Sequence, residues 1–182
     1  MNTFAEMEEE IIVESSNNTS TYYMDTPIGW ISISEDGKGI CGLYFVQPDM
    51  LEGQAGWAKS SGEPLLREAA SQLQAYFRGN LQRFDLPVSL RGTPFQVDDW
   101  HALMTIPYGE TRSYKQIAEQ IGRPKAFRAV GMANHRNPVS IIIPCHRVIG
   151  HHGAMVGYGG GVWRKEYLLA HEGKQAATSR LA

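Results

Sequence analysis

The stretch SYKQIAEQIGRPKAFRAVGMANHR, Ser113–Arg136, decides the fold of this sequence. Ser113 and Gln116 have the spacing of a capping box, which predicts that a helix begins here and runs through "YKQIAEQI". "GRP" is a sharp turn, and "KAFRAVGMANHR" predicts a second helix that Asn137 and Pro138 end. Two short helices joined by a tight turn are typical of the helix-turn-helix motif that reads DNA.

The second helix of this pair is both basic and slim. Lys125, Arg128 and Arg136 place positive charges where phosphates could be bound. Small side chains occupy positions between them: Ala126, Ala129, Gly131 and Ala133. A helix that reads bases in the major groove usually carries Asn, Gln, Arg or Lys at several positions. The small residues instead indicate a helix that fits a narrower space or approaches its partner closely.

Further helices flank the motif on both sides. A second capping box, at Thr93 and Gln96, predicts a helix that "IPYGE" ends. After the Gly-rich "GAMVGYGGG", the segment "VWRKEYLLAHE" predicts a last helix that stops at Gly173. Residues 92–173 are therefore expected to form a mostly helical domain, and residues 174–182 a frayed tail.

The N-terminal half has a different pattern. "WISIS" alternates apolar and polar residues and "EDGKG" is a turn, which together predict a β-hairpin. "PLLREAASQLQAYFRGN" predicts an amphipathic helix ended by Gly79, and "FDLPVSL" is a candidate strand. The apolar face of that helix consists of Leu66, Ala69, Ala70, Leu73 and Phe77. Residues 21–91 are thus expected to form an α/β domain. With the helical domain that follows, the fold class of the whole chain is α+β. Residues 1–20 are acidic and then rich in Ser, Asn and Thr, which predicts a flexible arm.

The chain has 182 residues and a formal net charge of −2, which hides an asymmetry. Residues 1–91 carry 6 Lys and Arg against 13 Asp and Glu, whereas residues 92–182 carry 11 against 6. A basic half on an acidic protein suggests an anionic partner such as nucleic acid, although a solvated surface would give the same pattern. No stretch approaches the roughly 20 apolar residues of a membrane span, and no basic segment precedes an apolar one at the start. Two distant cysteines fit a reducing, cytoplasmic setting.

The stretch "SIIIPCHRVIG", Ser140–Gly150, predicts a buried strand that ends in reactive side chains. A cysteine thiol has an ordinary pKa of about 8.5, so the nucleophilic thiolate of Cys145 needs a positive or hydrogen-bonding neighbour, for which His146 and Arg147 are candidates. His146 is the candidate base, yet adjacent side chains of a strand point to opposite faces. The two can pair only if Pro144 twists the chain or through a water, and Glu172 is a candidate acceptor behind the histidine.

Other chemistries fit this stretch less well. A cysteine protease needs an oxyanion hole and a separated His, and a phosphatase loop needs its Arg several residues after the Cys. A zinc site formed by the Cys145–His146 pair with His151 and His152 would require two adjacent pairs to converge tetrahedrally, without any Cys-x-x-Cys. An inert packed thiol is the remaining alternative, and it is the interpretation that fits Cys41 in "GICGLYF".

Two further features carry chemistry. "GYGGG", Gly157–Gly161, lets backbone N–H groups approach a ligand closely, unless the loop is only a mobile linker. Tyr158 within it could cover a base or form a pocket wall. Tyr114, at the start of the helix-turn-helix, offers a phenol to a phosphate or a leaving group, unless it packs in the core.

Together these segments resemble the O6-alkylguanine-DNA alkyltransferase family. "NPVSIIIPCHRVIG" is similar to the active-site signature of that family, and "GTPFQ", "IPYGETRSYKQIA", "RPKAFRAVGMANHRNP" and "KEYLLAHEG" match it as well. The match spans about residues 92–173 nearly without gaps, and "TPIGWISI…GICGLYF" resembles the family's variable domain more loosely. The resemblance implies a ribonuclease-H-like α/β domain followed by a helix-turn-helix domain with a short active-site strand.

The resemblance implies direct reversal of DNA damage. Cys145 would take an alkyl group from guanine O6, or from thymine O4, in one displacement and keep it, so that each molecule acts once. His146 would act as a base through a water, and Glu172 would hold it. Asn137 would brace the turn before the active-site strand. Tyr114 would hydrogen-bond the flipped guanine and press on the phosphate that turns it out.

The resemblance also implies the pocket and the DNA contacts. Arg128 would enter the base stack from a helix laid in the minor groove, where Ala126 and Ala129 permit close approach. The pocket would be lined by Val148, Tyr158, Gly159, Gly160 and Lys165. Lys165 would also help to hold the leaving group. The implied partner is double-stranded DNA carrying O6-alkylguanine, bound by a monomer that uses no cofactor.

Three features of this sequence, set against the pattern of the family that it resembles, make these expectations more specific. Position 159 is Gly where relatives often carry Ser or Ala, so the loop is looser and the range of alkyl groups is expected to change. Some relatives bind zinc through N-terminal Cys and His, but Cys41 stands alone there and no histidine precedes His101, so no metal site is expected. A further branch replaces the cysteine and only flags damage, which the intact Cys145 disfavours. The alternative function is a helix-turn-helix regulatory protein in which Cys145 merely packs.

Overall fold

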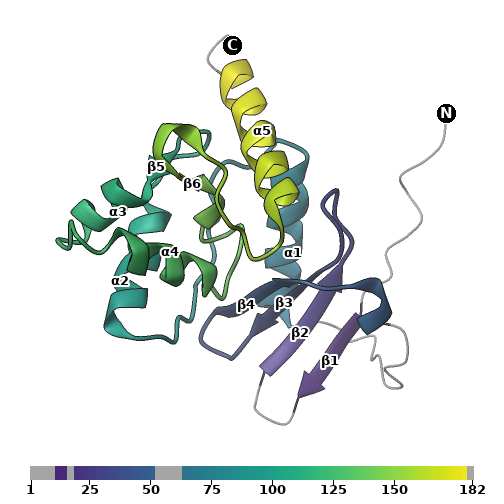
Figure 1. The fold of residues 1–182 in the computed structure, drawn as a ribbon. Coiled ribbons are helices and arrows are strands. Elements are labelled where there is room, and N and C mark those ends of the chain that lie inside the picture. Colours follow the sequence, from purple (N-terminus) through teal and green to yellow (C-terminus); the bar gives the residue numbers. More distant parts are fainter. Residues whose placement is uncertain (1–10, 16–18, 52–62, 180–182) are drawn as a thin grey trace.

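The computed structural model describes residues 11–15, 19–51 and 63–179 of the chain. A strand-rich N-terminal unit is followed by a helical C-terminal unit (Figure 1). The α+β class predicted from the sequence is confirmed.

The N-terminal unit is built on an antiparallel sheet with the strand order β1-β2-β3-β4. Its strands are β1 (Ile11–Ser15), β2 (Thr19–Met24), β3 (Ile31–Glu35) and β4 (Ile40–Phe45). The predicted hairpin is confirmed as β3 and β4, in which Ile31 pairs with Phe45 and Ile33 with Leu43. The inward side chains Ile31, Ile33 and Leu43 are fully buried, as period-2 alternation requires.

The expected flexible arm over residues 1–20 is wrong where the structure describes it. β1 pairs with β2 along its whole length. The first two residues of β2, Thr19 and Ser20, also lie within the predicted arm. Composition misled because the pairing of an antiparallel strand depends on backbone hydrogen bonds to its neighbour, which a polar composition does not prevent. Residues 1–10 and 16–18 lie outside the described residues.

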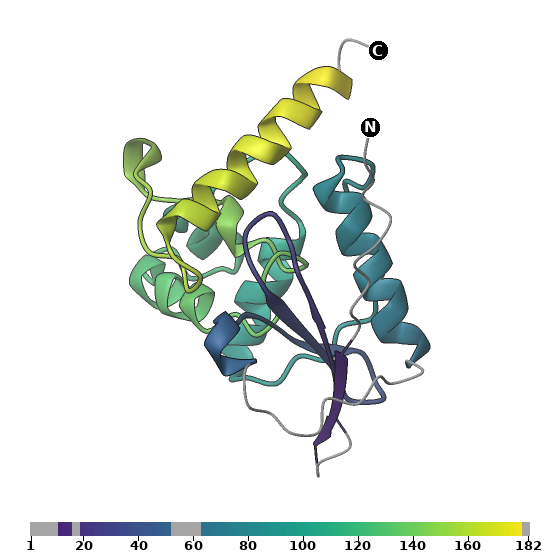
Figure 2. The same cartoon turned by 90° about the vertical axis from the view of Figure 1, so that its right-hand side faces the viewer.

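One face of the sheet is covered by α1 (Pro64–Phe77), which packs on β2 and β3 (Figure 2). Leu66, Ala69, Ala70 and Leu73 are buried as predicted. Tyr76 rather than Phe77 completes the buried face, because the Tyr76 hydroxyl finds an acceptor inside the protein, described below.

The segment "FDLPVSL" does not form a strand. It makes only an isolated parallel bridge, in which Val88 lies opposite Ile40. Ile40 N donates to Pro87 O and Ser89 N donates to Ile40 O. Pro87 has no N–H to extend the ladder, so pairing stops after this bridge.

The C-terminal unit contains four helices and two very short strands. The helices are α2 (Pro94–Met104), α3 (Tyr114–Gln120), α4 (Phe127–His135) and α5 (Val162–Ser179). The strands are β5 (Arg112–Ser113) and β6 (Val148–Ile149). This unit also contains the single-turn 3-10 helices η2 (Cys145–Arg147) and η3 (His151–Gly153), and the N-terminal unit contains η1 (Pro48–Met50). Both predicted capping boxes are confirmed, since the Thr93 and Ser113 hydroxyls accept from the backbone N–H of Gln96 and Gln116 and each glutamine accepts in return.

The last helix does not stop at Gly173, and residues 174–179 are not a frayed tail. α5 continues to Ser179, while residues 180–182 lie outside the described residues. A glycine inside a helix costs only about 1 kcal/mol, which tertiary contacts can offset. A Cβ on Gly109, which has a φ of 74°, would lie 2.7 Å from the Cβ of Ala176, so this loop packs tightly against the final turns.

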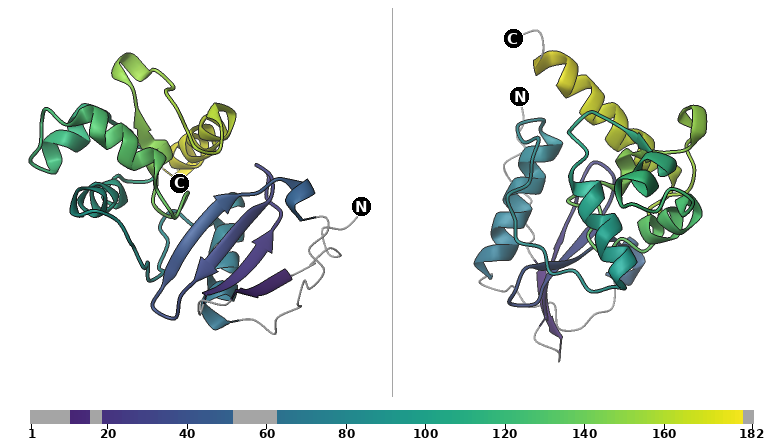
Figure 3. Two further views of the ribbon diagram at one scale, coloured as in Figure 1. Left: turned by 60° about the horizontal axis from the view of Figure 1, so that its bottom comes forward. Right: turned by 90° about the vertical axis from the view of Figure 1, so that its left-hand side faces the viewer.

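The two units are joined through the free edge of β4 (Figure 3, left). Leu43 N donates to Pro138 O at 2.8 Å, and Ser140 N donates to Leu43 O at 3.3 Å. From the other side Arg164 Nε donates to Ile28 O at 2.7 Å. The segment that precedes Cys145 is therefore anchored on the sheet.

Candidate active site

The predicted strand over Ser140–Gly150 is confirmed only at Val148–Ile149, which form β6, because the residues before Cys145 fold into consecutive tight turns. Ile142 N donates to Ser140 O at 2.8 Å across Ile141, whose φ is 70°. Cys145 N donates to Ile143 O at 2.8 Å across Pro144, at φ −82° and ψ 61°. Both are γ-turns, and the first holds a β-branched residue in the left-handed region at a cost on the order of 1–3 kcal/mol.

Asn137 holds these turns in place. Its Nδ2 donates to Ile143 O at 2.8 Å and its Oδ1 accepts from Val139 N at 3.0 Å, while Ile143 N donates to Val139 O at 2.9 Å. Ile141 and Ile143 are buried, which offsets the backbone strain. The apolar run therefore reports burial in a compact turn and not a strand, and the turn delivers Cys145 to the start of η2.

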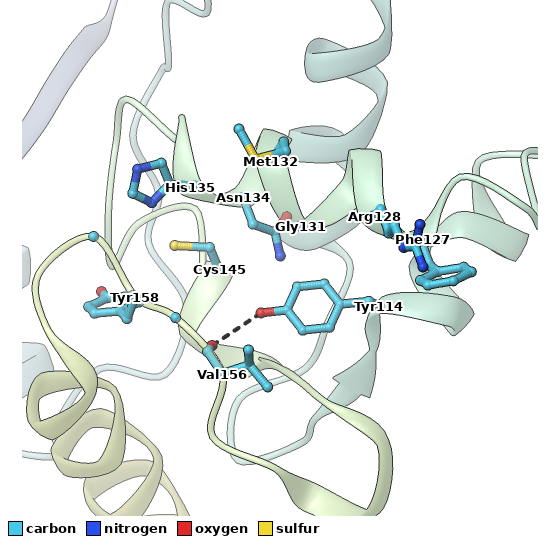
Figure 4. A pocket seen from close by; sticks show the side chains of 12 residues that line it. Tyr114, Phe127, Arg128, Gly131, Met132, Asn134, His135, Cys145, Val156 and Tyr158 are labelled. Atoms are coloured by element: carbon cyan, nitrogen blue, oxygen red, sulfur yellow. Dashed lines mark hydrogen bonds between the residues drawn. The ribbon is translucent and has the colours of Figure 1, made fainter.

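The Cys145 thiol is buried beside a pocket of about 380 Å³ (Figure 4). Burial raises its pKa to about 11, although the nearby Asn137 amide and the Lys165 ammonium act in the opposite direction. At neutral pH the resting thiol is therefore protonated, and it needs a base to become a nucleophile.

Glu172, which is fully buried, is the centre of a hydrogen-bonded network that joins α1, η2 and α5. Its carboxylate accepts from Tyr76 Oη at 2.8 Å, from Arg147 Nε at 2.9 Å and Nη2 at 3.0 Å, and from Gly109 N at 3.1 Å. His146 Nε2 lies 2.8 Å from its Oε1. Burial opposes ionisation, but the contacts with His146 and Arg147 outweigh it and hold the pKa of Glu172 well below its usual range.

His146 is fixed by this carboxylate. Burial lowers the pKa of the ring even though Glu172 favours its charged form, so the neutral imidazole is the resting state. With Nε2–H donating to Glu172, the lone pair lies on Nδ1, and no described residue provides a hydrogen-bond partner for that atom. A proton acceptor is thus held in the residue that follows the thiol.

The lower wall of the pocket is tied together by polar contacts. Tyr114 Oη donates to Val156 O at 3.3 Å, as drawn in Figure 4. Lys165 Nζ donates to Val148 O at 2.6 Å and to Val156 O at 3.2 Å. Burial lowers the pKa of Lys165, but the amine remains a donor held beside the thiol's end of the pocket.

The glycine-rich loop continues this wall from Val156. Tyr158 lines the pocket with Gly157 and Gly159 and packs on Phe45 of β4 at 6.0 Å between ring centroids. A Cβ on Gly160 would collide with the Phe45 ring, whereas one on Gly159 would meet nothing closer than 4.0 Å. The loop is therefore tightly packed at position 160 and open at position 159.

The predicted DNA-binding residues lie on the outer surface of the helix-turn-helix. α4 is shorter than predicted, since Lys125 precedes it, Ala126 is its N-cap and Arg136 its C-cap. Lys125, Arg136 and Ala129 are exposed, and Arg128 reaches the pocket edge over Phe127. The basic side chains and Ala129 are thus available to a partner, whereas the predicted surface residue Ala133 is buried because it packs into the core.

Several site residues were not predicted from the sequence. Phe127, Met132, Asn134 and His135 line the pocket from α4. Tyr76, Gly109 and Arg147 bind the Glu172 carboxylate. Only Arg147 carried a local signal, as part of the Cys-His-Arg run; the others reach the site through packing of segments distant in sequence.

Within residues 11–15, 19–51 and 63–179, no three His, Cys, Asp or Glu side chains come together as a metal would require. In the same ranges, none of the helices has the length and apolar character needed to traverse a bilayer.

An α/β domain, a helix-turn-helix, and a buried thiol backed by a His–Glu pair define a DNA-binding protein equipped with a nucleophilic cysteine. Family models described as "6-O-methylguanine DNA methyltransferase, ribonuclease-like domain" and "DNA binding domain" match residues 20–90 and 94–174. The chain therefore belongs to the 6-O-methylguanine DNA methyltransferase family, as the resemblance of its motifs predicted.

Relatives with this name are similar over most of the chain. The methylated-DNA–protein-cysteine methyltransferase of Mycobacterium leprae is 51% identical over 86% of this chain and 93% of its own. That of Methanosarcina barkeri is 50% identical over 83% and 96%. The solved O6-methylguanine methyltransferase of Mycobacterium tuberculosis has a TM-score of 0.73 at 46% identity, covering 84% of this chain and 92% of that one, and a structure of that protein in complex with DNA matches equally.

Proposed function

We propose that this protein repairs alkylated DNA by moving the alkyl group of O6-alkylguanine onto Cys145. The observation that carries the proposal is the buried thiol in a base-sized pocket, adjacent to a neutral His146 that Glu172 orients. Family membership and the relatives' names support the same activity. Because the thioether product is stable, each molecule acts once.

The thiol is activated by proton transfer. Its high pKa means that thiolate forms only as a base removes the proton, and His146 Nδ1 is the acceptor, through a bridging water. The ionised Glu172 stabilises the imidazolium that results. Asn137 positions the turn that presents the sulfur.

The transfer is one displacement at a saturated carbon. A bond forms between Sγ and the alkyl carbon while the carbon–O6 bond breaks, and both electrons of that bond leave with the guanine. Donors near the departing base favour this step, and we assign that role to Tyr114 and to Lys165, whose amine is fixed on Val148 O. A proton then returns to the guanine, which leaves uncharged.

The target base lies inside a duplex and must be rotated into the pocket, at a cost of a few kcal/mol of unstacking. We assign the filling of the vacated stack to Arg128, at the pocket edge. Small residues such as Ala126 and Ala129 allow α4 to lie close in the minor groove, while Lys125 and Arg136 meet phosphates. We further propose that a monomer acts in the cytoplasm, with residues 21–91 as scaffold and 92–173 as the reactive domain.

The alternative is a helix-turn-helix DNA-binding protein in which Cys145 only packs. A packed thiol needs no oriented imidazole, and a buried His–Glu–Arg network beside it would be an unexplained desolvation cost. The Glu172 network therefore favours alkyl transfer.

The test is the intact mass of the protein after incubation with a duplex that contains O6-methylguanine. We expect the mass to rise by one CH2 in the wild type and in Cys41→Ser, the other cysteine of the chain, and not in Cys145→Ser. A folded wild-type protein that gains no mass would refute alkyl transfer and leave the DNA-binding alternative.

A further inference from the structure

Behind the pocket, α2 carries a buried carboxylic acid that the transfer reaction does not use. Asp99 is fully buried, forms no ion pair in the described part of the chain, and has an Oδ1 atom without a hydrogen-bond partner there. A buried carboxyl group of this kind costs stability, so its presence suggests that it serves another purpose.

Asn134 of α4, which also lines the pocket beside Cys145, lies within hydrogen-bond distance of Asp99. An amide can be turned in two ways. With Nδ2 toward Asp99, it donates to Asp99 Oδ2 at 2.7 Å and to Val130 O at 3.3 Å; in the opposite orientation, drawn in Figure 4, its oxygen faces only acceptors. An ionised Asp99 therefore turns the amide nitrogen inward and the Asn134 carbonyl oxygen toward the pocket.

A carbonyl oxygen at this place selects for a particular donor. Once O6 carries an alkyl group, N1 of guanine has no proton, and N9 is bonded to the sugar. The exocyclic amino group is then the N–H donor that the base has left. Figure 4 shows Asn134 near Cys145 and Tyr114, and all three side chains line the pocket.

We propose that Asn134 is a specificity-determining residue that accepts a hydrogen bond from the amino group of O6-alkylguanine, and that Asp99 is the positioning residue that orients it. This inference rests on the proposed function and names how the same pocket recognises its base. A protonated Asp99 would instead donate to the Asn134 oxygen, which turns the amide over and presents an NH2 group, unable to accept, to the base.

The switch between these orientations falls near neutrality. Burial raises the pKa of Asp99 to about 7. The negative charge of Asp99 contributes to the rise in the pKa of Cys145 and of Tyr114, which line the same pocket as Asn134. The other titratable residues of α2, α3, α4 and η2 are exposed, namely Asp98, His101, Lys115, Glu119, Arg128 and His135, or bound to Glu172, namely His146 and Arg147.

The experiment compares two free bases that differ in one group, O6-benzylguanine and O6-benzylhypoxanthine, which lacks the amino group. The ratio of their rate constants for alkylating Cys145 is measured by intact mass as a function of pH. Both reactions need the same thiolate, so effects of pH on Cys145 or on folding cancel in the ratio. We expect the ratio to fall about five-fold between about pH 8.5 and pH 5.5, the equivalent of one hydrogen bond.

Variants separate the roles. Asp99→Asn is expected to make the ratio independent of pH, and Asn134→Leu to hold it at its low value throughout. The control Asp98→Asn removes an exposed carboxylate from the same helix and should retain the wild-type curve. A wild-type ratio that does not change with pH overturns the inference even if the variants misfold, whereas absence of Cys145 alkylation by both bases would overturn the proposed function itself.

Discussion

The two sides of Cys145 differ in how completely their polar groups are satisfied. On the α5 side, the Glu172 carboxylate accepts hydrogen bonds from Tyr76, Arg147 and Gly109 and binds His146. On the pocket side, Asp99 Oδ1 has no partner in the described chain. A carboxylate whose hydrogen bonds are all made, such as Glu172, is held rigidly and contributes to stability, whereas an incompletely paired one costs stability and is available to a ligand. Changes to the first side should therefore act mainly on folding, and changes to the second on reactivity.

The largest effect is expected from Glu172→Gln. The substitution leaves the buried Arg147 guanidinium without its counter-charge, which should reduce the free energy of unfolding by about 3–5 kcal/mol. Tyr76→Phe, which removes one donor to the same carboxylate, should cost only about 1 kcal/mol. Urea unfolding at pH 7 measures both; equal losses would mean that the ion pair contributes nothing beyond a neutral hydrogen bond.

The same variant has a predicted pH dependence. The folded pKa of Glu172 is depressed from 4.5, so its contribution is fully present above about that value and is lost as pH falls toward the folded pKa. The difference between wild type and Glu172→Gln should narrow as the pH is lowered below about 4.5. A difference that stays constant in acid would show that folding does not lower the pKa of Glu172.

Asp99→Asn should act in the opposite direction. The folded pKa of Asp99 lies above its unfolded value. The wild-type protein therefore keeps its full stability in acid, where Asp99 is neutral, and loses stability as the pH rises through about 7 and the buried carboxyl group ionises. The variant should gain about 2 kcal/mol over the wild type at alkaline pH, because an incompletely paired charge is removed, and nothing in acid. Thermal unfolding across this range measures the gain, and no gain at alkaline pH would place the pocket side among the satisfied regions.

Arg128→Ala tests the pocket side without touching the core. Repair of O6-methylguanine in a duplex should slow by about ten-fold, the equivalent of about 1.4 kcal/mol of lost contact to the opened stack. Alkylation by free O6-benzylguanine and the midpoint of unfolding should stay unchanged. Arg78→Ala, at the exposed end of α1, is the charge-matched control. Equal slowing on both substrates would remove Arg128 from the base-flipping step.

Gly159→Ser should have the smallest effect. A Cβ here meets open space and the backbone is not left-handed, so the fold should be unchanged within about 0.5 kcal/mol. The two added heavy atoms narrow the pocket, and transfer of benzyl should decrease by about three-fold relative to methyl, less than the roughly ten-fold of one methylene in a closed pocket because this wall is open. Rate constants with matched methylated and benzylated duplexes measure this ratio.

Local signals in the sequence were reliable. Both capping boxes, the β3–β4 hairpin and the apolar face of α1 depend on residues within one turn or one hairpin, and the structure contains them. The Cys-His-Arg run and the Gly-rich loop were found from residue types alone. The family followed from these segments because their order and spacing are specific.

What the sequence did not reveal depends on contacts between distant segments. The turns around Ile141 require the side chain of Asn137, and the same buried isoleucines could equally have occupied a strand. α5 passes Gly173 because Ala176 packs on Gly109. Tyr76 and Glu172 lie 96 residues apart, and no periodicity in α1 distinguishes Tyr76 from Phe77 as the inward residue. Burial of Asp99 likewise follows from how α4 lies on α2.

The junction at β4 also bears on how the protein avoids aggregation. β4 is an outer strand of the sheet, and a bare outer strand offers unpaired N–H and C=O groups to other chains. Here the backbone N–H and C=O groups of Ile40 form hydrogen bonds with Pro87 and Ser89. Those of Leu43 form hydrogen bonds with Pro138 and Ser140. The residues that shape the turn before the thiol thus also shield a sheet edge. Substitutions that loosen this turn would expose an aggregation-prone strand edge. Selection for solubility and selection for repair therefore act on the same few residues.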